Sequence, residues 1–167
     1  MRVEVILSLA AEVLRWTAAT IEGVNHSDIT TIEEETMKIT RIDRRQARHD
    51  PSRANFFDGE VNIQTLVSPA DSNELDLLTV YFSAGARTRP HIHEQDQVLH
   101  IIEGQGIVAT ETEKQVVSAG DVITVPAGTW HWHGATRASA MGHISVMKRG
   151  KTNWTVEEKN WATGYDE

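Results

Sequence analysis

The chain reads GARTRPHIHEQDQVLHIIEG over residues 85–104 and GDVITVPAGTWHWHGA over residues 120–135. In each stretch a turn rich in glycine or proline precedes two histidines separated by one residue: His91 and His93, then His131 and His133. Successive residues of a β-strand point to opposite faces, so residues two apart share a face. Two imidazoles placed in this way can bind one metal ion about 2.1 Å away. The two stretches therefore predict strands that carry a metal site.

The sequence around these stretches has the pattern of an all-β protein. Runs of apolar and β-branched residues alternate with clusters of glycine, proline, serine and aspartate. No helical segment separates these runs, which favours an antiparallel sandwich or barrel over βαβ units. Gly104-Gln105-Gly106 predicts a tight hairpin after a strand. The strands are predicted at residues 61–67, 75–82, 97–103, 107–111, 115–118, 122–125 and 141–147.

The alternation of side chains also selects among the remaining residues near the histidine pairs. Gln97 shares a face with His93, whereas His100 lies on the opposite face. A single His-x-His pair is weak support for a metal site, since most histidines are partly exposed polar residues. Two pairs, each after a turn, are much harder to explain by chance. His26 and His49 lie in polar segments, and we expect no role for them at the site.

The two stretches resemble the two motifs of the cupins. The first, G-x5-H-x-H-x3,4-E-x6-G, fits from Gly85 to Gly104, and the second, G-x5-P-x-G-x2-H-x3-N, fits from Gly120 to Ala135. Every spacing agrees, but Gln97 replaces the usual Glu and Ala135 the usual Asn. The resemblance covers about residues 55–150 and implies a double-stranded β-helix, the jelly-roll cupin barrel. It implies that the metal ion is held inside by His91, His93, Gln97 and His131.

Gln97 would change the character of such a site. Its carbonyl oxygen and the three imidazoles are all neutral, so they leave the full 2+ charge on the ion. Such an ion polarises a bound oxygen strongly, and the protein holds it less tightly. Glu94 and Asp96 are nearby, but the alternation points them away. The alternative is that Gln97 only lines the site and that water completes the ligand shell. Mn²⁺, Fe²⁺, Ni²⁺ and Zn²⁺ all tolerate this donor set.

A closer resemblance begins at the second motif. Residues 126–135 and 140–144 look like small bacterial cupins that act as manganese-dependent hydroxynitrile lyases, whose relatives are grouped with carboxymuconolactone decarboxylases. The resemblance implies lyase chemistry on a small oxygenated molecule, with Mn²⁺ as the favoured Lewis acid. It implies His143 first, and His133 second, as acid/base residues. The alternative for His143 is a buried histidine that is hydrogen-bonded to a neighbour in the barrel.

Two other functions remain open from the sequence. A cupin metal centre with free coordination positions also suits O₂-dependent oxidation, so the protein is alternatively a dioxygenase. It is alternatively a non-catalytic module that binds a small molecule, because fold alone does not determine function. The nearly intact metal motif argues against this last reading.

The chain divides into three segments. Residues 1–54 form an N-terminal extension, in which apolar residues at helical spacing predict a helix over about 5–21. Residues 55–150 form the barrel. Residues 151–167 form a polar tail whose aromatic residues, Trp154, Trp161 and Tyr165, we expect to pack back onto a surface. Trp130 and Trp132 alternate with the histidines, so we expect them to pack on the other face of their strand.

Composition narrows the possible partners. The formal net charge is −8, and no stripe of basic residues is present, which argues against nucleic acid or membrane as a partner. The absence of cysteine excludes disulfides and thiolate metal sites and fits a cytoplasmic location. The partly apolar outer face formed by Val98 and Ile102 predicts a homodimer or a higher homo-oligomer. We expect a small-molecule substrate.

Overall fold

Strands dominate the computed structural model, which describes residues 37–163 and 165. The helix predicted over residues 5–21 lies outside these described residues. From Lys38 onward the described chain forms one compact unit. In chain order its elements are η1 Arg44–Gln46, η2 Pro51–Phe56, β1 Phe57–Asp58, β2 Val61–Val67, β3 Leu75–Phe82, β4 Arg87–Thr88, β5 Ile92–His93, β6 Gln97–Thr110, β7 Lys114–Ser118, β8 Val122–Val125, β9 His131–Ala135, β10 Met141–Lys148 and β11 Thr152–Asn153.

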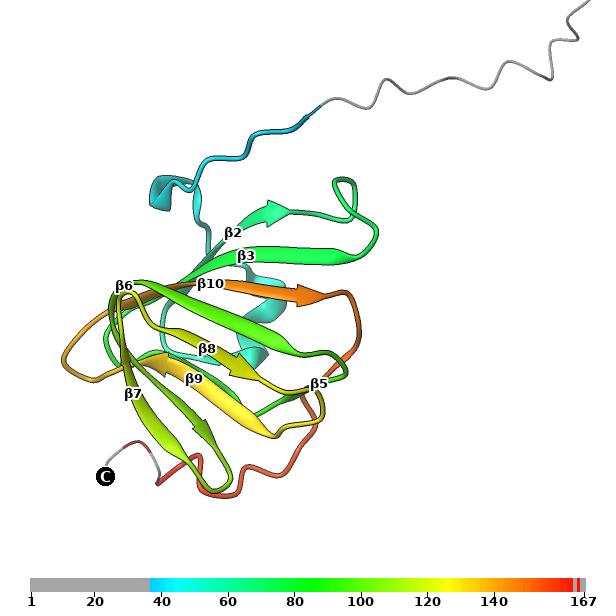
Figure 1. Cartoon of the computed structure of the whole chain (residues 1–167). Helices are drawn as coiled ribbons and strands as arrows, with labels where there is room; N and C mark the ends of the chain where they lie inside the picture. Colours follow the sequence, from blue (N-terminus) through cyan, green and yellow to red (C-terminus); the bar gives the residue numbers. More distant parts are fainter. Residues whose placement is uncertain (1–36, 164, 166–167) are drawn as a thin grey trace, which may run out of the picture. The chain divides into compact units, whose positions relative to one another are not determined.

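The strands form a nearly closed antiparallel barrel, as predicted. Their order is β1-β4-β9-β6-β10-β3-β2, with β7 and β8 both paired to β6, and β11 pairs separately with β5. In Figure 1, β2, β3 and β10 form one layer and β7 and β9 form the other. The predicted strands at 61–67, 75–82 and 122–125 have the same bounds as β2, β3 and β8. The local pattern of apolar and polar residues was therefore sufficient to predict the bounds of these three strands.

The predicted hairpin at residues 104–106 is wrong, because β6 runs through it without a turn. The first half of β6 pairs with β10 and β8, and its second half pairs with β9 and β7. Gly104 lies where the strand passes from one layer to the other, with a φ of +69°. A Cβ atom there would lie 1.8 Å from the Ala140 carbonyl oxygen. This glycine thus permits a close approach within a strand, and it does not mark a hairpin.

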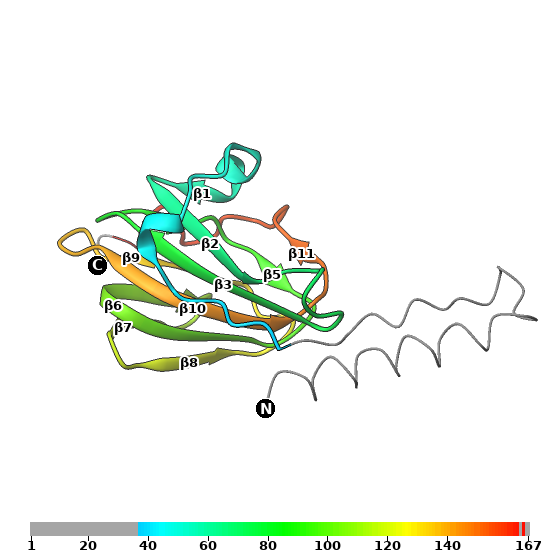
Figure 2. The ribbon, with the colours of Figure 1, turned by 90° about the horizontal axis from the view of Figure 1, so that it is seen from above.

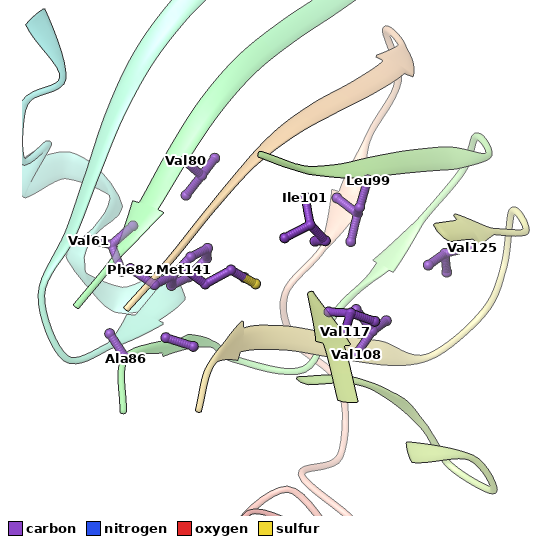
Figure 3. Packing of buried hydrophobic residues seen from close by; sticks show 11 residues of the cluster. Val61, Val80, Phe82, Ala86, Leu99, Ile101, Val108, Val117, Val125 and Met141 are labelled. Atoms are coloured by element: carbon purple, nitrogen blue, oxygen red, sulfur yellow. The ribbon is translucent and has the colours of Figure 1, made fainter. Parts of the chain in front are cut away.

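The main hydrophobic core fills the space between the two layers. Leu99, Ile101 and Phe82 have no exposed surface. Figure 3 shows Leu99 and Ile101 of one layer extending toward Val108 and Val117 of the other. The alternation along β6 that places Leu99 and Ile101 inside also places Gln97 inside. Core and polar site therefore share the interior of one barrel.

A second apolar cluster lies on the outer face of β6 and β9. Trp130 and Trp132 are buried there, as predicted, together with Trp161 and Tyr165 of the tail. The Trp130 indole donates to the Glu157 carbonyl at 2.8 Å. The tail is thereby attached to the barrel. Among the described residues, no helix is long and apolar enough to cross a membrane.

Candidate metal centre

His91 and His131 are neighbours across an isolated antiparallel bridge. The His91 amide donates to the His131 carbonyl at 3.0 Å, and the reciprocal bond measures 3.1 Å. Residues directly opposed in antiparallel strands point to the same face, and the two ring centroids lie 4.2 Å apart. The ring centroid of His93 lies 4.7 Å from that of His91 and 5.3 Å from that of His131. The fold therefore brings together the three histidines predicted as ligands.

His133 joins the same cluster. The ligand nitrogens of His91, His131 and His133 all lie within 4.8 Å of one another, so these three could hold one metal ion. His93 is outside this tightest group. Its Nε2, however, is buried and has no hydrogen-bond partner of normal geometry among the described residues, although Gln97 lies close enough to offset part of the lowering of its pKa. Its Nδ1 lies 2.9 Å from the Thr152 hydroxyl. His93 and His133 thus both adjoin the central pair.

Hydrogen bonds on the outer side determine which ring nitrogens face inward. His91 Nδ1 lies 2.8 Å from the Arg89 carbonyl oxygen, and His131 Nδ1 lies 2.9 Å from that of Thr129. A carbonyl oxygen only accepts, so each Nδ1 carries the proton. In the neutral rings each Nε2 then presents a lone pair to the interior. This is the usual arrangement of histidine ligands, which donate their other N–H to a backbone carbonyl.

Gln97 adds an oxygen donor to the cluster. Its amide nitrogen donates to Ser145 Oγ at 3.0 Å, which directs its Oε1 toward His131 Nε2 at 3.1 Å. Because the His131 proton is committed to Thr129, two lone pairs face each other at this distance, and they repel unless a cation lies against both. Two donor atoms about 2.1 Å from one ion and at right angles are about 3 Å apart. The spacing therefore fits a metal ion.

The carboxylates nearby do not take part. Glu94 Oε2 accepts from the Lys151 amide at 3.0 Å, and Asp96 Oδ1 accepts from the Ala127 amide at 2.8 Å. Both residues are exposed, as the alternation predicts. Within the part of the chain that the structure describes, the possible metal group consists of imidazoles alone.

Burial keeps the histidines of the cluster neutral at pH 7, because it disfavours the imidazolium. Desolvation lowers the pKa of His131 to about 4 and that of His143 to about 4. It also lowers the pKa of His93. It lowers the pKa of His91 and of His133 well below 6.5, and the neighbouring histidines lower both further. A neutral imidazole is the form that binds a metal ion or accepts a proton.

The pairing of β10 with β3 and β6 places His143 at the same interior space. His143 lies opposite Val80 of β3, and a register shift at one extra residue of β6 places it opposite Ile101 on the other side. The His143 ring centroid is 4.9 Å from that of His133, and Phe82 stacks on it at 5.6 Å. The Ile144 backbone partly offsets the lowering of its pKa, yet neither ring nitrogen has a hydrogen-bond partner of normal geometry among the described residues. A purely structural histidine would need such a partner.

Most side chains of the candidate metal centre line a cavity of about 470 Å³. A cavity of this size accommodates a small organic molecule. Its lining is partly polar and partly apolar. The polar side chains include His91, His93, Gln97, His133, His143 and Ser145, together with the charged Arg53, Asp76, Lys148 and Arg149. The apolar side chains include Phe57, Ile63, Leu78, Val80 and Trp154.

Three residues that contact this centre were not predicted as part of it from the sequence. Ser145 lies two residues after His143, so strand alternation could have placed it on the same face. Thr152 and Trp154 lie in the tail, and no local pattern connects them with the histidines. Their positions follow from the pairing of β11 with β5.

The lowered pKa of His143 predicts an acid-sensitive fold in the metal-free protein. In the unfolded chain the His143 imidazole binds a proton near pH 6.5, whereas in the folded chain it binds one only near pH 4. Between these values the unfolded state holds more protons, so the free energy of unfolding falls as the pH falls, by about 3 kcal/mol at pH 4 from this residue. Urea unfolding in the presence of a chelator, at several pH values, measures this free energy of unfolding. His143→Leu should remove this share, and an unchanged slope would contradict the prediction.

Comparison with known proteins agrees with this geometry. Residues 78–147 match the cupin domain. The chain is 32% identical over 114 residues to an (R)-mandelonitrile lyase from Granulicella tundricola, a match that covers 68% of this chain and 86% of the relative. It is 44% identical over 46 residues to an acireductone dioxygenase from Parasynechococcus marenigrum, which covers 25% of each protein.

Solved structures share the architecture. A cupin-like protein from Thermotoga maritima has a TM-score of 0.55 and 28% identity, covering 66% of this chain and 90% of that one. A polyketide cyclase from Streptomyces resistomycificus has a TM-score of 0.61 and 19% identity, covering 74% and 91%. The second likeness concerns the fold alone.

Proposed function

The chain belongs to the cupin superfamily, and from that premise we propose that it is a metal-dependent lyase that cleaves a C–C bond in a small hydroxylated molecule, as a hydroxynitrile lyase does. One observation carries the proposal. His143, buried and neutral, faces a cavity that His91 and His133 of the possible metal group also line. The resemblance to the mandelonitrile lyase, over most of its length, supports it.

We assign the metal ion to His91, His93, Gln97 and His131, with Mn²⁺ as the favoured ion. The inward lone pairs of His91 and His131 and the unpartnered Nε2 of His93 support this assignment. When bound, the ion is a Lewis acid that lowers the pKa of a substrate hydroxyl, and the lack of a carboxylate ligand leaves its charge undiminished.

His143 serves as the general base. One of its two unpartnered ring nitrogens accepts the hydroxyl proton of a cyanohydrin. The C–C bond then breaks, its electron pair leaves with cyanide, and the oxygen–carbon bond becomes the carbonyl of an aldehyde. The imidazolium returns its proton to cyanide, which leaves as HCN. His133, whose ring lies beside that of His143, is the second candidate for this proton.

The apolar side chains of the cavity hold the organic part of the substrate. Ile63 of β2 and Val80 of β3 lie in register with His143 of β10, and Leu78 lies in register with Ser145. A substrate that covers these apolar side chains excludes water from His143 and strengthens the electrostatic interactions in the site. This arrangement orients the hydroxyl toward His143.

A dioxygenase is the second candidate. The match to acireductone dioxygenase favours it, although that match covers only a quarter of the relative. An imidazole-rich metal group with open positions is compatible with binding of substrate and O₂ together. The two candidates differ in one requirement, which is O₂.

An anaerobic assay tests the proposed function. Protein loaded with Mn²⁺ should cleave mandelonitrile to benzaldehyde and cyanide in equal amounts, at the same rate with and without O₂. Turnover that requires O₂ would favour the dioxygenase. Protein that binds none of Mn²⁺, Fe²⁺, Ni²⁺ or Zn²⁺ by elemental analysis and turns over no substrate would contradict both enzymes and favour a binding module.

A further inference from the structure

We propose that the C-terminal segment 152–154 is part of the metal centre, with Thr152 as a positioning residue for His93 and Trp154 as a positioning residue for His91. Both residues lie beyond residue 147, where the matched cupin domain ends. The inference rests on the metal site of the proposed function. It adds that the barrel alone does not hold its ligands in place.

Thr152 fixes the orientation of His93 across the β5–β11 pair. Its strand, β11, lies beside β5 (Figure 2), and the register of this pair places Thr152 directly opposite His93. Two more bonds maintain this register, because the Glu94 amide donates to the Lys151 carbonyl at 3.2 Å and the Lys151 amide donates to Glu94 Oε2 at 3.0 Å. The Thr152 hydroxyl then lies 2.9 Å from His93 Nδ1.

The consequence for His93 is a defined ring orientation, and a metal ion at Nε2 would select the tautomer in which Nδ1 carries the proton. When Nδ1–H donates to the hydroxyl, the buried Nε2 presents its lone pair to the interior, where it has no partner in the described residues. In His91 and His131 the Nε2 lone pair also faces the interior, because each Nδ1–H donates to a backbone carbonyl. Among these three, His93 alone depends on a side chain for this bond, so a single substitution can remove it.

Trp154 acts on His91 by packing. Its ring stacks on the His91 ring with centroids 4.3 Å apart and an interplanar angle of 28°. Phe56 of η2 stacks on the Trp154 ring at 4.5 Å and 14°. Trp154 therefore holds the His91 ring from one side while the Arg89 carbonyl holds its Nδ1. The two contacts leave the imidazole little freedom to rotate.

The rest of the tail is anchored independently of the site. The Trp161 indole donates to the Thr88 carbonyl at 3.0 Å, and Arg87 Nη1 donates to the Trp161 carbonyl at 2.8 Å. The Arg87 guanidinium lies 4.0 Å from the Trp161 ring centroid. The segment that carries Thr152 and Trp154 is thus attached to the barrel at both ends, by β11 and by Trp161.

The test measures metal affinity and not turnover alone. Thr152→Val keeps the side-chain volume but loses the hydroxyl, and it should weaken Mn²⁺ binding about 10- to 100-fold in a competition titration with a chelator. Thr152→Ser keeps the hydroxyl and should bind like the wild type. Thr155→Val is the matched control, since Thr155 is an exposed threonine of the same segment. Thermal unfolding of the metal-free variants shows whether each one folds.

A second measurement does not depend on the stability of Thr152→Val. Co²⁺ quenches the fluorescence of nearby indoles, and its d–d absorption reports its ligands. Addition of Co²⁺ should quench the wild type, and Trp154→Phe should lose most of this quenching. Thr152→Val should change the d–d spectrum.

The outcomes separate this inference from the proposed function. A wild type that binds no metal ion overturns both. A wild type that binds Mn²⁺ with a Thr152→Val variant of equal affinity, or Co²⁺ quenching that persists in Trp154→Phe, overturns only the role of the tail. Binding weakened as much in Thr152→Ser as in Thr152→Val would show that the hydroxyl does not account for the loss, and it would also overturn the inference.

Discussion

His131→Leu should abolish stoichiometric metal binding and lower the turnover of a cyanohydrin by at least about 10³-fold, since loss of several kcal/mol of Lewis-acid stabilisation corresponds to this factor. His131 contacts two of the other proposed ligands, Gln97 and His91. Its Nε2 faces Gln97 Oε1 at 3.1 Å, and its backbone pairs with that of His91. Leucine preserves the backbone bridge and most of the buried volume while it removes the donor nitrogen.

Elemental analysis and a chelator titration measure the loss of metal. His100→Leu is the matched control, because His100 is an exposed histidine on the outer face of β6 and its loss should leave metal content and turnover unchanged. Gln97→Glu retains an oxygen donor and should retain the metal ion. A His131→Leu protein that binds one metal ion per chain as tightly as the wild type would rule out the proposed ligand set.

His143→Leu should lower turnover by about 10²- to 10⁴-fold, the range for loss of a positioned general base, while the metal ion stays bound. It should not lower the stability of the protein at pH 7. The two ring nitrogens of His143 are buried without hydrogen-bond partners in the described residues, and an unsatisfied buried polar group costs free energy that leucine avoids. Phe82, which stacks on the ring, would pack against leucine instead.

Steady-state kinetics, metal analysis and urea unfolding of the same variant separate these effects. His133→Leu is the comparison, because the His133 ring lies next to that of His143 in the same cavity. A greater loss of turnover in His133→Leu would transfer the role of general base to His133. Wild-type turnover in both variants would contradict acid/base catalysis by this pair.

The strands and the histidine group were predictable because both follow from local periodicity. The alternation along residues 61–67 and 75–82 defines β2 and β3 without reference to the rest of the chain. His91 with His93, and His131 with His133, each share a face for the same reason. The assignment of His93, and not His133, as the third imidazole came from the resemblance to the cupins, since both pairs have the same spacing.

The course of β6 was not predictable from its own residues. Gly104-Gln105-Gly106 has the composition of a hairpin turn, and the chain uses it to pass between layers within one strand. Whether the chain turns or continues at Gly104 depends on Ala140 and Met141, which approach Gly104 from the loop before β10 and from β10 itself. A contact between residues so far apart in the chain leaves no local pattern.

By itself, the sequence determined an all-β cupin barrel and a cluster of inward-facing histidines with Gln97 beside them, because side-chain alternation and turn chemistry are properties of a few consecutive residues. The tertiary structure alone decided that β6 belongs to both layers, that the pairing of β10 with β3 places His143 beside Val80 at the cavity, and that Thr152 and Trp154 support His93 and His91. Each of these depends on the register between strands that are distant in sequence, and register is set only when the whole barrel buries its core.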